Sequence, residues 1–234
     1  MITTQPPTTD LGDQRRRRPM RLLVASSVIW ASVVAGAVPA TAIPSASGAA
    51  AVTSTSTMPP EPGSTLGRRI AHLARQEVGA HERTGQNDYP RKYQRANKHI
   101  VYGEAWCGIF TYWVWTKAGV VRRPSMNPSR GNEQGHYATY WQEWASDHQR
   151  WKPLKKRNPE VGDLVVYGTF AVSGHIGVVV DVKYNRRGKA THIRTVEGNL
   201  SNHQVGDLGW RKLSELTGNG QKASGFVSPT KVPR

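Results

Sequence analysis

The chain has 234 residues, a formal net charge of +16 and a single cysteine. One cysteine excludes an internal disulfide, and the length leaves room for one folded domain behind an atypical N-terminal stretch. The positive charge favours a polyanionic partner, such as an anionic wall polymer, a phospholipid surface or a nucleic acid, but a solubilising surface would give the same balance.

Residues 1–42 predict a secretory signal peptide. Arg15–Arg18 and Arg21 precede an uncharged apolar run of 17 residues, Leu22 to Val38, and small residues follow in Ala40-Thr41-Ala42. The run is shorter than the roughly 20 residues that cross a bilayer, so cleavage after Ala42 is favoured over an uncleaved anchor. The arginine run matches a twin-arginine signal only weakly, which leaves the export route open. We therefore expect a secreted protein that meets the membrane only through its signal sequence.

Residues 43–63 are built mainly from Ser, Thr, Ala, Pro and Gly. This stretch has few large apolar side chains, so it buries too little surface to offset the entropy lost on ordering. We expect it to be a flexible linker. Residues 64–234 then form one domain without internal repeats. The mature chain, residues 43–234, keeps a net charge near +13 after the signal is removed.

The first part of this domain is predicted to be helical. Apolar residues recur at helical spacing, with Gly79 and Gly119 placed to end two of the helices. The polar stretch 82–88 is predicted to be a loop. The third helix begins at Cys107, and its apolar side chains predict deep packing. The four expected helices cover residues 64–78, 89–97, 107–118 and 136–149.

The spacing of the apolar residues changes after Pro159, where short β-branched segments alternate with Gly-containing or charged turns. Helices that precede strands indicate an α+β fold, with the N-terminal helices packed against one face of a C-terminal antiparallel β-sheet. The expected strands cover residues 164–167, 176–182 and 193–196.

Cys107 at the start of a helix is the candidate nucleophile. The unpaired backbone N–H groups and the positive end of the helix dipole favour a thiolate there, and the same groups could hold an oxyanion that develops on a carbonyl. A buried structural cysteine or an intermolecular disulfide are the alternatives for a lone thiol in a secreted chain.

A thiol nucleophile needs a base, and the predicted hairpin favours His175 over the other histidines. Centring its turn on Arg186 places His175 opposite Glu197 and His192 opposite Val180, with an uncertainty of one or two residues. Asn199 lies on the same side as Glu197. Either Glu197 or Asn199 could then accept the ring N–H of His175 and leave the other nitrogen for the Cys107 proton.

These residues lie in four segments that together resemble the CHAP family (cysteine, histidine-dependent amidohydrolase/peptidase), which is related to the NlpC-type cell-wall peptidases. The resemblance extends from about Ile70 to Leu200. The segments are Trp106-Cys107-Gly108-Ile109-Phe110, Pro159-Glu160-Val161-Gly162-Asp163-Leu164-Val165, Gly174-His175-Ile176-Gly177-Val178-Val179 and Val196-Glu197-Gly198-Asn199.

The resemblance implies a papain-like α+β fold and hydrolysis of amide bonds in peptidoglycan. The bond would lie in the stem or cross-bridge peptide, or at the sugar–peptide junction, as for an N-acetylmuramoyl-L-alanine amidase. Carried over by position, Cys107 is the nucleophile, His175 the base, and Glu197 with Asn199 the orienting groups. The separate wall-binding repeats of many relatives are not visible, so wall retention would depend on charge or on the Trp-rich segment.

The expected partners are peptidoglycan and anionic wall polymers, with no nucleic acid, no cofactor and a monomer as the default state. Some relatives bind calcium, but Glu82, Asp88 and Glu104 are too scattered to predict a metal site. Trp106, next to the nucleophile, is expected to line a substrate groove, whereas most other tryptophans should lie in the core.

Two other classes of function compete with the hydrolase. A catalytically inactive, basic wall-binding module would explain the charge, but it has no need for the complete Cys, His and Glu/Asn set. A metal-dependent nuclease or peptidase is disfavoured because no His-Glu-x-x-His pattern occurs in the chain.

Overall fold

The computed structural model describes residues 64–95, 103–126, 135, 137–169 and 174–233, which all belong to one compact unit. The expected signal peptide, 1–42, and linker, 43–63, lie outside the described residues. The helices come first in the chain: α1 (Thr65–Gln76), α2 (Arg91–Arg95), α3 (Cys107–Ala118) and α4 (Tyr140–Asp147). The strands follow: β1 (Trp151–Pro153), β2 (Leu164–Tyr167), β3 (His175–Tyr184), β4 (Ala190–Glu197), β5 (Gly206–Lys212), β6 (Thr217–Gly218) and β7 (Gln221–Val227), with a short 3-10 turn, η2 (Leu213–Glu215), after β5.

One of the two glycines expected to end a helix does so: Gly119 ends α3. Helix α1 ends at Gln76, three residues before Gly79, with Glu77 as its C-cap. The Ser64 hydroxyl accepts the Gly67 N–H at 3.0 Å and begins α1. Gly119 ends α3 in the left-handed conformation, with φ 84°. The prediction for α3 is confirmed over its whole length. The fourth helix is shorter than its predicted span of 136–149, and the positive φ of Gln149 stops any continuation there.

The strands form one antiparallel sheet in the order β1-β7-β2-β3-β4-β5, and β6 pairs with β7. Together with the helices this confirms the predicted α+β class. The sequence predicted β2, β3 and β4 but not the strands on either side. Strand β7 is short of large β-branched residues, yet it lies between β1 and β2 inside the sheet.

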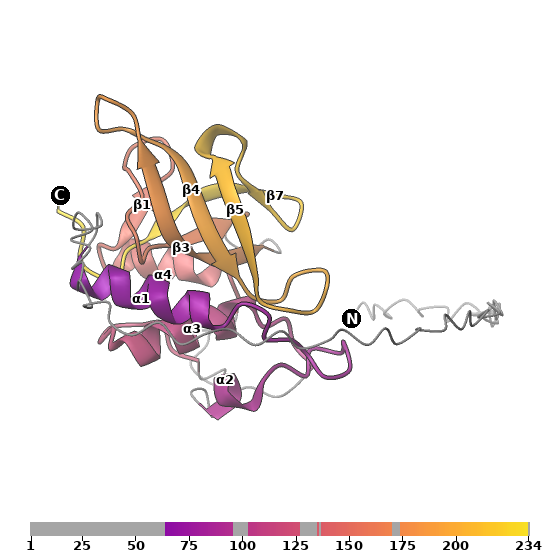
Figure 1. The fold of residues 1–234 in the computed structure, drawn as a ribbon. Helices are drawn as coiled ribbons and strands as arrows, with labels where there is room; N and C mark the ends of the chain where they lie inside the picture. The colour runs from indigo at the N-terminus through magenta and orange to yellow at the C-terminus, as the bar shows by residue number, and fades with distance from the viewer. Residues whose placement is uncertain (1–63, 96–102, 127–134, 136, 170–173, 234) are drawn as a thin grey trace, which may run out of the picture. The chain divides into compact units, whose positions relative to one another are not determined.

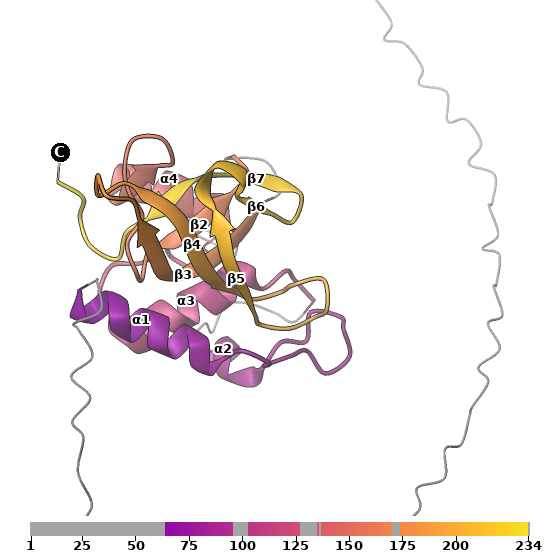
Figure 2. The same cartoon turned by 45° about the horizontal axis from the view of Figure 1, so that its top comes forward.

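Side chains of β2 alternate between two apolar layers, because successive residues of a strand point to opposite faces. Leu164 and Val166 join the main core, which α1, α3 and α4 supply from the helical side. Val165 and Tyr167 join a smaller second core on the other face. Figures 1 and 2 show α1 and α3 side by side along one side of the sheet.

The register of the β3–β4 hairpin differs from the predicted one. Asn185 and Lys189 close the turn, which centres it on Arg187, and Glu197 therefore pairs with Gly177. The predicted pairing of Glu197 with His175 is wrong by two residues, and His192 pairs with Lys183. A shift of two residues keeps the same face, so His175 and Glu197 still lie on one side of the sheet.

A buried ion pair joins β1 to the turn before β2. Lys152 Nζ lies 2.9 Å from Asp163 Oδ2 and 3.0 Å from Glu160 Oε2, and both Lys152 and Asp163 are buried. Burial raises the pKa of Asp163 to about 7, while Lys152 and the Glu160 N–H favour the carboxylate. The lysine thus stabilises a charge that the core would otherwise disfavour.

Replacing Lys152 with Met should destabilise the fold by about 3 kcal/mol at pH 8, because a buried carboxylate loses its cation. The loss of stability should become smaller toward pH 5, since Asp163 with its raised pKa can then take up a proton. Urea unfolding followed by tryptophan fluorescence measures both values. Lys156→Met is the control, because Lys156 is exposed. Equal stability of the two variants at pH 8 would contradict the prediction.

Candidate active site

Cys107 is the first residue of α3, and its side chain is buried, with 4% of the residue surface exposed. The Phe110 N–H already bonds to the Trp106 carbonyl, as in regular helix. The N–H groups before Phe110 have no such intrahelical acceptor, and Trp106 offers no side-chain cap. The sulfur therefore lies where an anion is electrostatically favoured.

His175, the first residue of β3, connects the thiol to a carboxylate. Its imidazole interacts with the Cys107 side chain, and its Nε2 lies 2.9 Å from Glu197 Oε2, which makes an ion pair when the ring is protonated. Because Nε2 faces Glu197, Nδ1 is the nitrogen available to the thiol. The structure thus brings Cys107, His175 and Glu197 together.

The charges of His175 and Glu197 stabilise each other. Burial would lower the pKa of His175, but its contacts with Cys107 and Glu197 outweigh burial and raise it to about 10. Burial would likewise raise the pKa of Glu197, but His175, Arg211 and Thr195 lower it to about 2. At neutral pH these shifts favour a protonated imidazole beside an ionised carboxylate.

Glu197 is itself held by three donors that meet at its second oxygen, Oε1. The Tyr167 hydroxyl donates at 2.7 Å, the Thr195 hydroxyl at 2.6 Å and the Arg211 guanidinium at 2.5 Å. The Arg211 group also donates to the Tyr167 and Thr195 oxygens, at 2.6 Å each. The Tyr167 ring stacks on His175 with centroids 5.8 Å apart. The carboxylate is thus fixed in place while its other oxygen faces the imidazole.

Sequence reasoning did not find these three supporting residues. Thr195 could have been found, since it lies two residues before Glu197 and shares its face. Tyr167 pairs with His175 across β2 and β3, which the predicted strands alone did not reveal. Arg211 comes from β5, a strand that the sequence did not predict.

Gly177 explains how Glu197 reaches His175 despite the shifted register. Glu197 pairs with Gly177, and a Cβ at Gly177 would lie 2.4 Å from Glu197 Cγ. The absence of a side chain lets the glutamate lie across β3, toward the histidine two residues away. Glycine at this position is therefore part of the site's geometry.

Asn199, the other expected orienting residue, follows the end of β4 in a left-handed turn with φ 59°. Within the described part of the chain its side chain makes no hydrogen bond to His175. Of the two candidates, the structure places only Glu197 against the imidazole.

Trp106 lies inside the fold, which does not support its expected place in a substrate groove. The residue is fully buried, and its indole N–H donates to Glu82 Oε1 at 2.6 Å. Tyr89 and Tyr93 pack on the indole, with ring centroids 6.2 and 6.0 Å away. Trp106 thus anchors the loop that enters α3, and Glu82, which also accepts the Asn87 N–H, is its polar partner.

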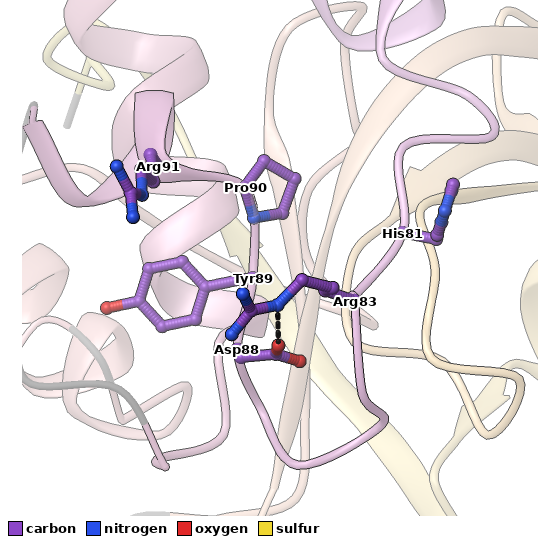
Figure 3. A pocket seen from close by; sticks show the side chains of 6 residues that line it. All are labelled: His81, Arg83, Asp88, Tyr89, Pro90 and Arg91. Carbon is purple, nitrogen blue, oxygen red and sulfur yellow. Dashed lines mark hydrogen bonds and ion pairs between the residues drawn. The ribbon is translucent and has the colours of Figure 1, made fainter.

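A pocket of about 360 Å³ opens beside this aromatic cluster (Figure 3). Tyr89 forms part of its wall and contacts Trp106, the neighbour of Cys107. Arg83 pairs with Asp88 at 3.2 Å, and Figure 3 shows Arg91 apart from this pair, near Tyr89 and Pro90. The remaining lining residues are His81 and Pro90.

The described residues contain no group of three or more His, Cys, Asp or Glu side chains that could hold a metal ion. They also contain no helix long and apolar enough to cross a membrane.

Comparison with known families identifies the segment that carries the site. The family model described as the CHAP domain matches residues 99–199, which confirms the resemblance over that range. The matched range contains Cys107, His175, Glu197 and Asn199. The match supports a peptidoglycan-hydrolase-like function. No curated protein and no solved structure matched the chain.

Replacing Arg211 with Gln should destabilise the fold by about 2 kcal/mol, because Glu197 is fully buried and loses a charged donor. The pKa of Glu197 should become less depressed, so acid unfolding should begin at a higher pH than in the wild type. Urea and acid titrations followed by circular dichroism measure both effects. Arg194→Gln removes the more exposed pair with Asp207 and should cost at most about 1 kcal/mol. Identical acid-unfolding curves for the wild type and Arg211→Gln would contradict the prediction.

Proposed function

We propose that this chain, a member of the CHAP family through residues 99–199, is a secreted thiol hydrolase that cleaves amide bonds in bacterial peptidoglycan. One observation carries the proposal: His175 lies between a thiol at a helix N-terminus and a buried, ionised carboxylate. The basic sequence and the apparent signal peptide are consistent with an enzyme that works on a wall rich in anionic polymers.

The first half of the reaction is acyl transfer to sulfur. The Cys107 thiolate attacks the amide carbonyl carbon, and the unpaired N–H groups at the start of α3 stabilise the negative charge that develops on the oxygen. Protonated His175 then gives its proton to the amine nitrogen as the C–N bond breaks. The amine leaves, and an acyl group remains bound to Cys107 as a thioester.

The second half restores the thiol by hydrolysis. Neutral His175 takes a proton from water, and the resulting hydroxide attacks the thioester carbonyl. The C–S bond breaks, the carboxylic acid leaves, and the proton on His175 balances the returned thiolate. Glu197 holds the imidazole in one orientation through both halves. Tyr167, Thr195 and Arg211 act through Glu197 and are positioning residues.

Cleavage should depend on the Cys107 thiol. The full chain and its Cys107→Ala variant are incubated with isolated peptidoglycan, and released fragments are followed by mass spectrometry and by new amino termini. We expect fragments from the wild type only, because the variant has no nucleophile, and the fragment masses will distinguish peptide cleavage from amidase cleavage. If neither protein releases fragments from several wall types while both bind them, the chain is a wall-binding module.

The identity of the orienting group can be tested with two variants. Glu197→Gln should lower kcat on the order of 100-fold, because the imidazole loses its ionised partner. The pKa of His175 should also fall, so the alkaline limb of the pH–rate profile should move to lower pH. Asn199→Gly keeps the left-handed backbone and should retain wild-type kcat.

The two outcomes are measured as pH profiles of kcat and kcat/KM on a soluble peptidoglycan fragment. A large loss in Asn199→Gly with little change in Glu197→Gln would assign the orienting role to the amide instead. Circular dichroism of both variants separates loss of activity from loss of fold.

A further inference from the structure

A second pocket, of about 340 Å³, lies between the turn after β1 and the tip of the β3–β4 hairpin. We propose that this basic pocket binds phosphate groups of an anionic polyol-phosphate polymer of the cell wall and anchors the enzyme there. The choice of a wall polymer rests on the proposed function. The pocket is lined by Leu154, Lys155, Lys156, Arg157, Asn158, Lys189, Ala190 and Leu213.

All the charged residues that line the basic pocket are positively charged. Four of its eight residues are Lys or Arg, and none of the eight is acidic. Lys155, Lys156 and Lys189 are exposed, and their side chains form no ion pair within the described part of the chain. The two nearest acidic residues along the chain, Glu160 and Glu215, pair with other lysines instead. Gathering like charges around one hollow is unfavourable until an anion neutralises them.

The two walls of the basic pocket are locked together by hydrogen bonds. The Asn158 side chain donates to the Gly188 carbonyl at 2.8 Å and accepts the Ala190 N–H at 3.1 Å. The Tyr184 hydroxyl donates to the Pro159 carbonyl at 3.1 Å. Segments about thirty residues apart in the chain are thereby held in one arrangement. A pocket fixed in this way loses little entropy when an anion binds.

The basic pocket lies far from the candidate catalytic residues. Strand β3 has ten residues, begins at His175 and ends at Tyr184, where the hairpin tip starts. At about 3.3 Å per residue, the tip is about 30 Å from His175. Ala190 and Leu213, which line the basic pocket, belong to or pack against the second core, on the face away from α1 and α3. Occupation of the pocket should therefore affect retention on the wall and not the chemical step.

The lining also favours a phosphate polymer over other polyanions. No aromatic side chain lines the basic pocket, so it offers no surface on which nucleic acid bases could stack. None of the exposed large hydrophobic residues of the described structure lines it either, so it lacks side chains that would insert into a membrane. Charge-assisted contacts between several cations and repeated phosphates match what the lining provides.

The test measures binding of poly(glycerol phosphate) to the full chain in a Cys107→Ala background, at several salt concentrations. Lys155→Gln, Lys156→Gln and Lys189→Gln together should weaken binding by about tenfold or more and flatten its salt dependence, because up to three phosphate contacts are lost. The matched control combines Lys117→Gln, Arg122→Gln and Lys222→Gln, which removes the same charge from exposed positions elsewhere. It should change the Kd by less than about threefold.

Equal weakening in both triple variants, or none in the pocket variant, would overturn the proposal. A larger loss of binding to duplex DNA, or to phosphatidylglycerol vesicles, than to poly(glycerol phosphate) would overturn it as well and assign the pocket to that ligand. With Cys107 intact, the pocket variant should keep wild-type kcat/KM on a soluble peptidoglycan fragment. A wild-type chain that binds the polymer but hydrolyses nothing would refute the proposed catalysis and leave the binding site standing.

Discussion

The candidate site depends on the ionised carboxylate of Glu197 and on the groups that compensate its buried charge. A fully buried charge is unfavourable unless its partners compensate it, and here each carboxylate oxygen has its own set. One oxygen receives the Tyr167, Thr195 and Arg211 donors, and the other faces His175. Four strands supply these groups, so the charge of Glu197 is fully compensated only in the assembled sheet.

This dependence explains why the site lies at the boundary between the two layers of the fold. The nucleophile belongs to a helix that is buried on nearly every side, whereas the imidazole and its carboxylate lie on the sheet face away from that helix layer. The two halves meet only at the start of α3 and the start of β3. Trp106, held by Glu82, fixes the loop that enters α3. Rigid packing on both sides thereby sets the position of the thiol relative to the ring.

Positive charge is distributed unevenly over the same scaffold. Arg211 compensates the buried carboxylate of Glu197, and Lys152 compensates that of Asp163. The lysines of the basic pocket have no such partner in the described structure and face outward. Net charge thus has two separate physical roles in this chain, one in stabilising buried carboxylates and one that is open to a polyanion.

Much of this protein was determined by local signals in its sequence. The helix that begins at Cys107 and ends at Gly119 was predictable from apolar spacing and a C-terminal glycine, and β2, β3 and β4 from β-branched runs. The side-chain contact of His175 with Glu197 was also predictable, because a register error of two residues keeps both side chains on the same face of the sheet. Only the tertiary structure decided how Glu197 is held, that of the two expected orienting residues it is Glu197 that lies against His175, and that Trp106 is buried. Those outcomes depend on strands such as β5 and β7, whose place in the sheet comes from contacts between distant segments, which a local pattern does not encode.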